Sequence, residues 1–350
     1  MERQPRAHFG VYKVNRLTLL VLGLLLVALA TYRYNPIQKV SSVVDRYTHS
    51  RADQGVALDG KSLAGKNADD LRRYLTDYAK SHNVSPRDAA IDPVTKGVIP
   101  ELNGRELDVD ATIEKVLRLP ANSVVRPVYR DLPPAKTIKD FTDRPVYHGN
   151  PAKHAVGLVI NVAWGEKYLP EMLKTLAKHN AKATFFVVGR WADAHPDLLK
   201  DIAFAGHDIA NHGYDDRLEP AKLTRDKLIG DIQKGAQAIK QITGIEPVYY
   251  SPHMGQVSSA VTKAASDLKL RTVMWSVDTR DWQEPGVATI TNAVLKAQPG
   301  AIVLLHPKAQ TAQALEGAVT GLQSRGYSLL AMRELLSPSP TAPVAATTER

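Results

Sequence analysis

The 350-residue sequence contains no cysteine. This absence excludes disulfide bridges, thiolate metal sites and cysteine nucleophiles. It does not place the protein in a compartment, because an exported protein can also lack disulfides. The rest of the composition is ordinary for a soluble globular protein. At this length the chain has room for one large domain and a smaller one.

The sequence also lacks a basic cluster with interleaved aromatic residues, the pattern that a nucleic-acid-binding protein is expected to carry. The net charge of +9 is modest for this length, and part of it lies in the first sixteen residues. We therefore expect no nucleic-acid partner. A mildly basic surface suits an anionic cell wall or membrane face, but it is also what an ordinary solvated surface looks like.

One uncharged apolar run is present near the N-terminus, at residues 17–30, and basic residues precede it. A membrane span needs about 20 apolar residues, so the run fits the core of a signal peptide better. The small-x-small pattern Ala28-Leu29-Ala30 provides a cleavage site. The alternative is an uncleaved membrane anchor through residues 17–32. Residues 1–32 are thus predicted as a signal peptide or anchor, and both export the remainder to the cell surface or the extracytoplasmic membrane face.

Residues 51–130 predict a small α/β domain. An amphipathic helix begins at 68–75, a turn-rich stretch covers 92–104, a second helix lies near 112–119, and an alternating strand covers 124–129. The Pro-Glu-x-x-Gly-x-x-x-Asp-Val pattern of residues 100–109 resembles the small peptidoglycan-binding-type domain that precedes VanW-like proteins. A structural spacer domain is the alternative.

Residues 131–153, marked by four prolines, predict a linker, and residues 337–350, rich in Pro, Ala and Thr, predict a disordered tail.

Residues 154–336 predict the main domain, in which apolar strands alternate with helical patterns. Continuous apolar strands of this kind indicate a parallel sheet buried on both faces, with enough repeats to close a barrel. The predicted strands are 155–162, 182–188, 207–211, 248–250, 271–277 and 301–305, and the predicted helices include 166–180, 196–205 and 223–243. In such barrels, chemistry gathers at the carboxyl ends of the strands.

Five short segments fall at those strand ends. They are Asn161-Val162-Ala163-Trp164-Gly165, Asn211-His212-Gly213-Tyr214-Asp215-Asp216, Ser251-Pro252-His253-Met254-Gly255, Asp278-Thr279-Arg280-Asp281-Trp282 and Leu304-Leu305-His306. Together they resemble the motifs of the polysaccharide deacetylases of the NodB homology type (carbohydrate esterase family 4). The resemblance implies a distorted (β/α) barrel and a cell-wall glycan partner.

Hydrolysis of an acetamide is difficult because the amide is a poor electrophile and water a poor nucleophile. The resemblance implies a divalent, zinc-like metal, held by one Asp and two His, that polarises the carbonyl and lowers the pKa of bound water. It also implies a second Asp as base, an Arg that orients this base, and a His that protonates the leaving amine.

Four of these positions are altered in this sequence. Ala163 stands at the base position, Trp164 at the position of the metal-binding Asp, Asp216 at that of the second metal-binding His, and Ser251 at that of the Arg. Removing one partner of a buried ion pair is costly, whereas replacing both with neutral groups can be tolerated. The loss of both base and Arg therefore predicts a stable neutral site without activity by the usual route.

The remaining motif positions match. His212 corresponds to the first metal-binding His and His306 to the acid, with Asp278 expected to tune that acid. The other matches are predicted to contact substrate: Asp281, Trp282 as a groove wall, Leu304, and Met254, whose backbone N–H is a candidate oxyanion donor.

Two readings of the altered site stay open. His212, Asp216 and His253 would be a legitimate two-His, one-carboxylate set for a divalent metal, although each also has an ordinary role at a strand end, loop or turn. Trp164 can stack on sugar faces and form an aromatic clamp with Trp282, or it can fill the cavity left by the metal.

A subgroup resemblance rests on residues 148–151, 160–170 and 182–191. These segments look like the sporulation-linked deacetylase homologues of spore-forming Firmicutes, the YlxY type, over most of residues 60–335. The altered first motif belongs to this subgroup, whereas Asp216 departs from the His that the subgroup keeps there.

The sequence thus supports three hypotheses. The leading one is an exported, wall-facing protein that binds an N-acetylated glycan, with peptidoglycan the expected polymer, and has little or no deacetylase activity. The second is an active N-deacetylase with a non-standard metal site and His306 as acid. The third is a scaffold in spore or envelope assembly.

Overall fold

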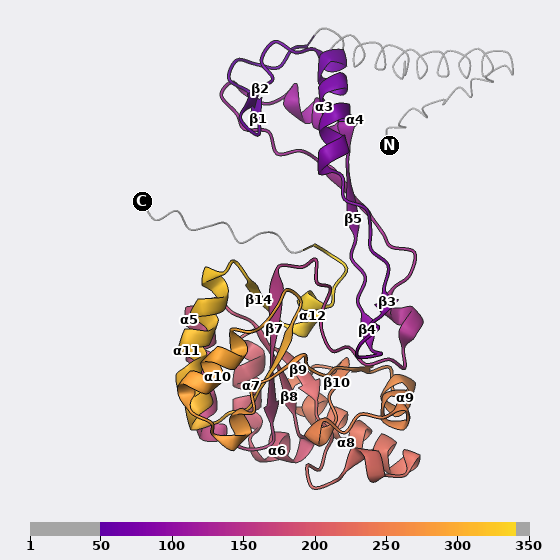
Figure 1. Ribbon diagram of the computed structural model, residues 1–350, viewed down its shortest axis with the longest axis vertical. Helices are drawn as coiled ribbons and strands as arrows, with labels where there is room; N and C mark the ends of the chain where they lie inside the picture. Colours follow the sequence, from indigo (N-terminus) through magenta and orange to yellow (C-terminus); the bar gives the residue numbers. More distant parts are fainter. Residues whose placement is uncertain (1–49, 341–350) are drawn as a thin grey trace, which may run out of the picture. The chain divides into compact units, whose positions relative to one another are not determined.

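The computed structural model describes residues 50–340, which form two units (Figure 1). Within this range the smaller unit holds residues 50–83 and 107–130, and the larger unit holds residues 84–106 and 131–340. The predicted signal peptide or anchor at residues 1–32 lies outside the described residues. Between residues 50 and 340, no helix is long and apolar enough to cross a membrane.

The smaller unit is built on two helices, α3 (Ala68–His82) and α4 (Val109–Val116), beside the short strands β1 (Ala57–Leu58) and β2 (Lys61–Ser62). A capping box begins α3, because the Asn67 side chain accepts from the Asp70 N–H at 2.9 Å and the Asp70 carboxylate accepts from the Asn67 N–H. The buried leucines of α3, Leu71 and Leu75, are one turn apart and face the core of this unit.

The chain passes between the two units in β5 (Gly104–Leu107) and β6 (Tyr129–Leu132), which form a two-stranded sheet. The predicted strand at 124–129 was therefore placed too early. Pro127 lacks the N–H that a strand interior donates, and the regular strand starts only beyond it.

The larger unit contains one curved sheet in which every neighbouring pair of strands is parallel. Its strands are β7 (Ala155–Val162), β8 (Ala183–Val187), β9 (Asp208–Asn211), β10 (Tyr249–Tyr250), β11 (Arg271–Thr272), β12 (Val277–Asp278), β13 (Ile302–Leu305) and β14 (Ser328–Leu330). The order is β11-β10-β9-β8-β7-β13-β12, and β14 also pairs with β7. The predicted (β/α) barrel type is confirmed in the form of a half-barrel.

Helices follow the strands and cover the outside of the sheet (Figure 1). They are α5 (Leu169–Lys178), α6 (Gly189–Ala194), α7 (Pro196–Phe204), α8 (Arg225–Thr243), α9 (Ser259–Asp267), α10 (Val287–Val294), α11 (Ala309–Ser324) and α12 (Met332–Leu335). Short 3-10 turns are η1 (Ile138–Phe141), η2 (Glu166–Tyr168), η3 (Pro220–Lys222), η4 (His253–Gly255) and η5 (Asp281–Gln283).

Strand β7 is buried along its whole length, and its residues alternate between two cores. Val156, Leu158 and Ile160 belong to the core between the sheet and the helices. Ala155 and Val159 belong to a second core on the inner face of the sheet. This period of two places every odd-numbered residue of β7 toward the inside of the half-barrel.

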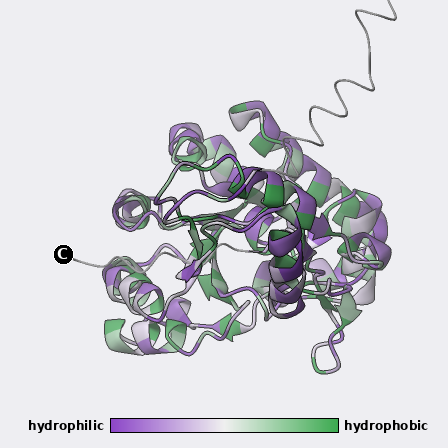
Figure 2. Ribbon diagram, turned by 90° about the horizontal axis from the view of Figure 1, so that it is seen from above, coloured by the Kyte–Doolittle hydropathy of each residue, from purple (hydrophilic) through white to green (hydrophobic). Residues whose placement is uncertain are grey.

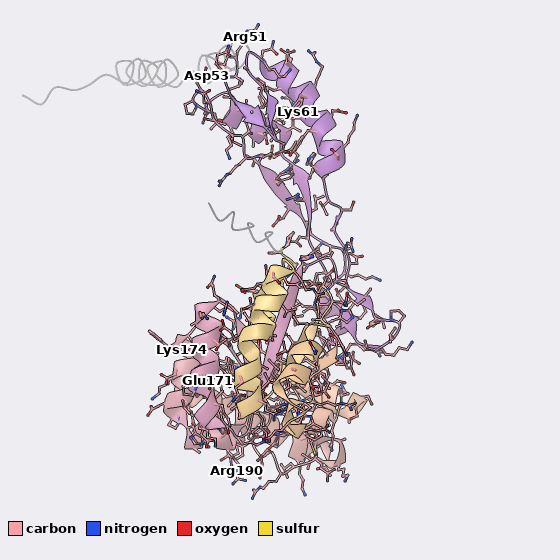
Figure 3. The ribbon with its side chains drawn as sticks, turned by 60° about the vertical axis from the view of Figure 1, so that its left-hand side comes forward. Arg51, Asp53, Lys61, Glu171, Lys174 and Arg190 are labelled. Carbon is pink, nitrogen blue, oxygen red and sulfur yellow. The ribbon has the colours of Figure 1, made fainter. Side chains whose placement is uncertain are left out.

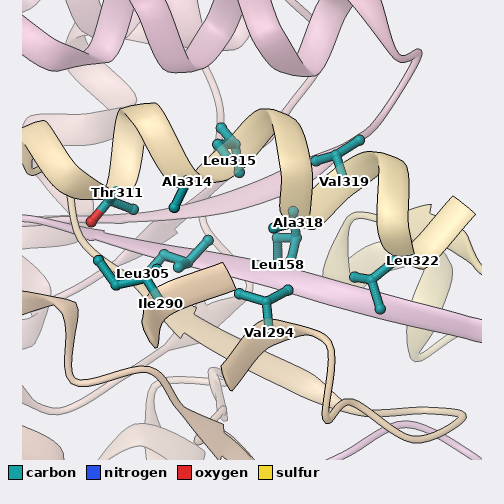
Figure 4. A pocket seen from close by; sticks show the side chains of 10 residues that line it. All are labelled: Leu158, Ile290, Val294, Leu305, Thr311, Ala314, Leu315, Ala318, Val319 and Leu322. Carbon is teal, nitrogen blue, oxygen red and sulfur yellow. The ribbon is translucent and has the colours of Figure 1, made fainter. Parts of the chain in front are cut away.

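The outer core is closely packed. Figure 4 shows Leu158 of β7, Val294 of α10 and Leu315 of α11 meeting between strand and helices, with no room left for a water molecule. The covering helices are amphipathic, and both purple and green faces are visible along them in Figure 2. On α5, the charged side chains of Glu171 and Lys174 point away from the sheet (Figure 3).

The segment predicted as a linker, residues 131–153, is part of the larger unit. Val146 is fully buried and forms a parallel bridge with Val273, and His148 bridges Ala301. Residues 84–106, predicted within the small domain, also belong to this unit, where β3 (Ala90–Ile91) pairs with β4 (Val98–Ile99). The prolines of this segment suggest a linker, but short buried stretches lie beside them. Amino-acid composition alone does not reveal these stretches.

The start of the predicted disordered tail is also held in place. The Lys153 ammonium donates to the Glu334 carbonyl at 2.7 Å and to the Ser337 carbonyl at 2.5 Å, and the Asn103 N–H donates to the Pro338 carbonyl. Lys153 is only 2% exposed, and burial lowers its pKa to about 8. Residues 341–350 lie outside the described range.

Candidate functional site

A cavity of about 550 Å³ opens at the carboxyl ends of the parallel strands. Thirteen residues line it: Asn161, Ala163, Trp164, His212, Asp216, His253, Met254, Gly255, Trp275, Asp278, Trp282, Leu304 and His306. All five sequence motifs contribute, because β7, β9, β10, β12 and β13 end at the same edge of the sheet.

The first motif leaves β7 in a tight turn at Gly165. This residue has φ 82°, and a Cβ there would lie 2.0 Å from the Pro307 carbonyl oxygen. Only glycine tolerates both the left-handed backbone and the close approach. The turn sets the preceding residues, Ala163 and Trp164, against the loop that carries His306.

The Trp164 indole stacks on the His306 imidazole, with ring centroids 5.7 Å apart and an interplanar angle of 14°. The Lys308 ammonium lies 4.9 Å from the centroid of the same indole and forms an ion pair with Glu284 at 2.9 Å. Trp164 remains 38% exposed, so part of its surface faces the cavity and solvent. Trp282, which is 50% exposed, supplies a second aromatic wall.

His306 is held by a fully buried carboxylate, that of Asp281. The His306 backbone N–H donates to Asp281 Oδ2 at 2.6 Å, and the His306 Nδ1 lies 2.8 Å from Asp281 Oδ1. The Thr311 hydroxyl donates to Asp281 Oδ2 at 2.7 Å. These bonds orient the ring and leave Nε2 as its remaining nitrogen.

This arrangement exchanges two predicted roles. We predicted Asp278 as the partner of the acid and Asp281 as a substrate contact. Asp278 is instead exposed at the cavity, and its Oδ1 accepts from the Arg280 N–H at 2.9 Å. The reason is the left-handed conformation of Arg280, φ 52°, which turns the chain so that Asp281 enters the protein.

His212 and His253 form the deep end of the cavity. The His212 Nδ1 lies 2.6 Å from the Ser251 carbonyl, so this nitrogen carries the proton and Nε2 is an acceptor. The two imidazole centroids are 4.1 Å apart. Burial is the main cause that lowers the pKa of His253 to about 4 and the pKa of His212 well below its usual value, so both rings are neutral at neutral pH.

Two buried polar atoms in the cavity wall lack a hydrogen-bond partner within residues 50–340. They are Asn161 Oδ1 and His253 Nε2. A buried polar atom without a partner costs about 1–3 kcal/mol. Such atoms in a cavity wall are typical of a place that a ligand or water completes.

Asp216 lies on the exposed loop after β9. The loop is fixed by Asp231 of α8, whose carboxylate accepts from the Tyr214 N–H at 3.1 Å and the Asp215 N–H at 3.0 Å. Asp215 is paired with Arg217, whose Nε lies 2.8 Å from its carboxylate. Asp216 lines the cavity and has no hydrogen-bond or ion-pair partner in the described part of the chain.

The structure brings the predicted metal-binding residues to one cavity but does not assemble them into a metal site. Over residues 50–340, no three His, Cys, Asp or Glu side chains are placed to hold a metal ion together. His212 donates its Nδ1–H to Ser251 and keeps Nε2 for a ligand, but Asp216 lies exposed on its loop. These residues do not fit a three-ligand site, so we derive no step through a metal.

The remaining predicted residues lie where the motifs suggested. Leu304 is buried at the base of the cavity. Met254 has a left-handed backbone, φ 53°, and a side chain that is largely exposed at the rim. Sequence reasoning missed Asn161 and Trp275, which also line the cavity. The period-two pattern of β7 could have identified Asn161, which has the same parity as Ala163.

Comparisons with known proteins agree with this geometry. Residues 148–273 match the family model described as polysaccharide deacetylase. The chain is 36% identical over 269 residues to the uncharacterized protein YlxY of Bacillus subtilis, covering 77% of this chain and 84% of YlxY. It is 36% identical over 176 residues to a peptidoglycan-N-acetylglucosamine deacetylase of Bacillus cereus, covering 48% of this chain and 82% of that enzyme.

A solved structure extends the likeness beyond the family model. BA3943 of Bacillus anthracis, described as a CE4 family pseudoenzyme, has a TM-score of 0.70 and 33% identity, covering 77% of this chain and 96% of BA3943. A mutant of BA3943 is described as having restored enzymatic activity, with the same TM-score at 32% identity, covering 77% and 99% of the two chains. The predicted family and its YlxY-type subgroup are confirmed: the chain belongs to the polysaccharide deacetylases of carbohydrate esterase family 4.

Proposed function

We propose that this protein binds N-acetylated cell-wall glycan, with peptidoglycan the expected polymer, and has little or no deacetylase activity. The observation that carries the proposal is a cavity with aromatic walls and a His306–Asp281 pair, lined also by Ala163 and Trp164. By the family resemblance, these two residues stand at the base and metal-Asp positions.

The chemistry available in the cavity supports binding more than hydrolysis. His306, oriented by Asp281, can donate a proton to a leaving amine. Activating water requires a base, and Ala163 has no group that accepts a proton. The family generally uses a divalent metal, which lowers the pKa of bound water. In this chain Trp164 replaces the family's metal-binding carboxylate.

The wall of the cavity is suited to a sugar ring. Trp164 and Trp282 present partly exposed indoles, and indoles stack on the apolar faces of sugars while their N–H reaches a polar partner. A cavity of about 550 Å³ lies within the range of ligand sites in proteins. The Bacillus cereus relative is a peptidoglycan-N-acetylglucosamine deacetylase, which favours peptidoglycan as the polymer.

Export and a role in sporulation are parts of the same proposal. The basic segment and apolar run of residues 17–30 favour export to the cell surface or the extracytoplasmic membrane face. The YlxY likeness motivates the sporulation hypothesis. Fractionation of cells that carry the full chain with a C-terminal tag tests export, since a cytoplasmic pool alone would contradict it.

The main experiment compares acetate release with glycan binding. The native chain is incubated with N-acetylglucosamine oligomers and peptidoglycan, with added zinc, cobalt or nickel, beside the His306→Ala variant. We expect binding without metal-dependent acetate release. Release that the variant abolishes would instead favour the active N-deacetylase, and absence of both binding and release would favour the scaffold.

A positive control comes from restoring the family residues. A variant carrying Ala163→Asp, Trp164→Asp, Asp216→His and Ser251→Arg regains the base, its Arg and the metal-binding set. We expect zinc-dependent acetate release from this variant, in line with the mutant of BA3943 described as having restored activity. Release by the native chain at a similar rate would contradict the proposal.

A further inference from the structure

The charged side chains of the cavity are unbalanced. Asp216 and Asp278 are the acidic residues that line it, and its described lining contains no Lys or Arg. Nearby cations are engaged elsewhere: Lys308 pairs with Glu284, and Arg217 binds the carboxylate of Asp215. Asp216 itself has no hydrogen-bond or ion-pair partner among residues 50–340.

The two histidines of the lining present ring nitrogens to the cavity. The His212 Nδ1–H donates to the Ser251 carbonyl at 2.6 Å, and His253 Nε2 has no partner within residues 50–340. The nitrogen that His212 presents is therefore an acceptor. Asn161 Oδ1, a second acceptor in the same wall, lacks a donor among the described residues. A ligand with several N–H donors would therefore satisfy the acceptors at the deep end of the cavity.

The aromatic walls have the same preference. Trp164, Trp275 and Trp282 line the cavity, and the face of an indole attracts a cation. Trp164 already has one cation, Lys308, at 4.9 Å from its ring centroid. Partly desolvated cation–π contacts and a carboxylate that forms no direct ion pair within residues 50–340 together form an environment that favours an ammonium group over a neutral amide.

We infer that the cavity prefers glycan residues with a free amino group, such as glucosamine, over their N-acetylated forms. The inference rests on the proposed glycan binding and specifies its ligand: the protein binds a largely N-acetylated polymer, and the cavity holds the deacetylated residues of that polymer more tightly than the acetylated ones. The ammonium donates to Asp216 and to the acceptors of the deep end. An acetamide has one N–H and carries no charge. It also adds a carbonyl acceptor to a wall whose acceptors, His212 Nε2 and Asn161 Oδ1, already lack donors within residues 50–340.

Bulk charge does not produce this preference. The chain has a net charge of +9, which repels a cationic oligomer from the surface as a whole. A preference for the amine therefore has to arise locally, and a single carboxylate in the cavity is the group to test.

The test measures the affinity of the full chain for two matched probes, the tetramer of glucosamine and the tetramer of N-acetylglucosamine. Calorimetric titrations are carried out at about pH 6, where the amines are largely protonated. We expect the glucosamine tetramer to bind at least about tenfold more tightly, a difference of about 1.4 kcal/mol.

Two variants locate the effect. Asp216→Asn keeps the shape of the side chain and removes its charge, and we expect it to weaken binding of the glucosamine tetramer and so abolish most of the preference. Asp197→Asn is the matched control, because Asp197 is an exposed carboxylate on α7 that does not line the cavity. It should keep the full preference.

The outcomes separate the inference from the function on which it rests. Equal affinities, tighter binding of the N-acetylated tetramer, or a preference that survives Asp216→Asn overturns the inference and leaves glycan binding in place. Failure of the native chain to bind either tetramer overturns both.

Discussion

The indole of Trp164 lies almost parallel to the imidazole of His306, 5.7 Å away between ring centroids. Trp164, which we predict to stand at the family's metal-binding Asp position, therefore covers His306, the predicted acid. This contact makes the altered first motif part of the packing of the site.

The Asp281 carboxylate should be more important for stability than that of Asp278. Asp281 is fully buried and accepts bonds from two groups of His306 and from Thr311. Asp281→Ala leaves these donors unsatisfied and should lower the free energy of unfolding by about 3–5 kcal/mol. Asp278→Ala removes an exposed carboxylate and should change it by less than about 0.5 kcal/mol. Urea unfolding of both variants measures the difference, and equal losses would restore the role that we first gave to Asp278.

Stability should fall as the pH is lowered from about 6.5 to about 4. Burial lowers the pKa of His207 and of His253 to about 4, whereas an unfolded His titrates near 6.5. In this interval the unfolded state binds protons that the folded state cannot bind, so the full stability is present above about 6.5 and is lost below it. Each of these histidines should cost roughly 3 kcal/mol by about pH 4, and His212 acts in the same direction.

His207→Gln tests this prediction outside the cavity. The His207 Nδ1 accepts from the Ala183 N–H, so the ring has to be neutral, and the glutamine carbonyl can accept the same bond. The variant should lose roughly 3 kcal/mol less than the native chain between about pH 7 and about pH 4. Parallel stability curves for the two proteins would contradict the assignment.

The two exposed indoles should contribute to glycan affinity. Trp164→Ala or Trp282→Ala removes a stacking surface and should weaken binding of the preferred tetramer about tenfold. Phe204→Ala is a suitable control, because Phe204 is an aromatic residue that is 96% exposed at the end of α7, and it does not line the cavity. Fluorescence or calorimetric titration gives the affinities, and a loss of similar size in the control would indicate a non-specific effect.

An Asp introduced at position 163 and an Arg introduced at position 251 should be energetically coupled. Ser251 is 2% exposed, so Ser251→Arg alone buries a charge without a partner and should destabilise the protein by about 3–5 kcal/mol. Adding Ala163→Asp supplies the opposite charge, and we expect the double variant to recover at least about 1 kcal/mol relative to the sum of the single changes. A double-mutant cycle of unfolding free energies checks this, and strict additivity would show that the two positions do not interact.

Parts of the fold that depend on a local sequence pattern can be predicted, whereas parts that depend on contacts between distant segments cannot. The limits of β7 are predicted correctly because all of its residues except Asn161 are apolar or glycine, and the strand is buried on both faces. The segment 271–277 is predicted as one strand but contains two, β11 and β12, which pair with β10 and β13 respectively. Their separation depends on which neighbour each end meets, and a local hydrophobic pattern does not contain that information.

The candidate site can likewise be predicted from the sequence only in part. The positions of Ala163, His212 and His306 follow from the motifs, since each comes directly after a strand. The choice between Asp278 and Asp281 depends on the left-handed backbone of Arg280, for which the residue type gives no signal. The unpartnered Asn161 Oδ1 is likewise a property of three-dimensional surroundings, although the strand period indicates the face on which Asn161 lies.

The order in which the chain builds its two units affects how it responds to proteases. The chain leaves the smaller unit after residue 83, enters the larger unit for residues 84–106, returns at 107, and leaves again after 130. The two units are therefore joined by three covalent connections, and a single cut at any one of them leaves at least part of the smaller unit covalently joined to the larger one. Release of the whole smaller unit requires cleavage at all three, and the released unit then consists of two fragments that end at residues 83 and 130.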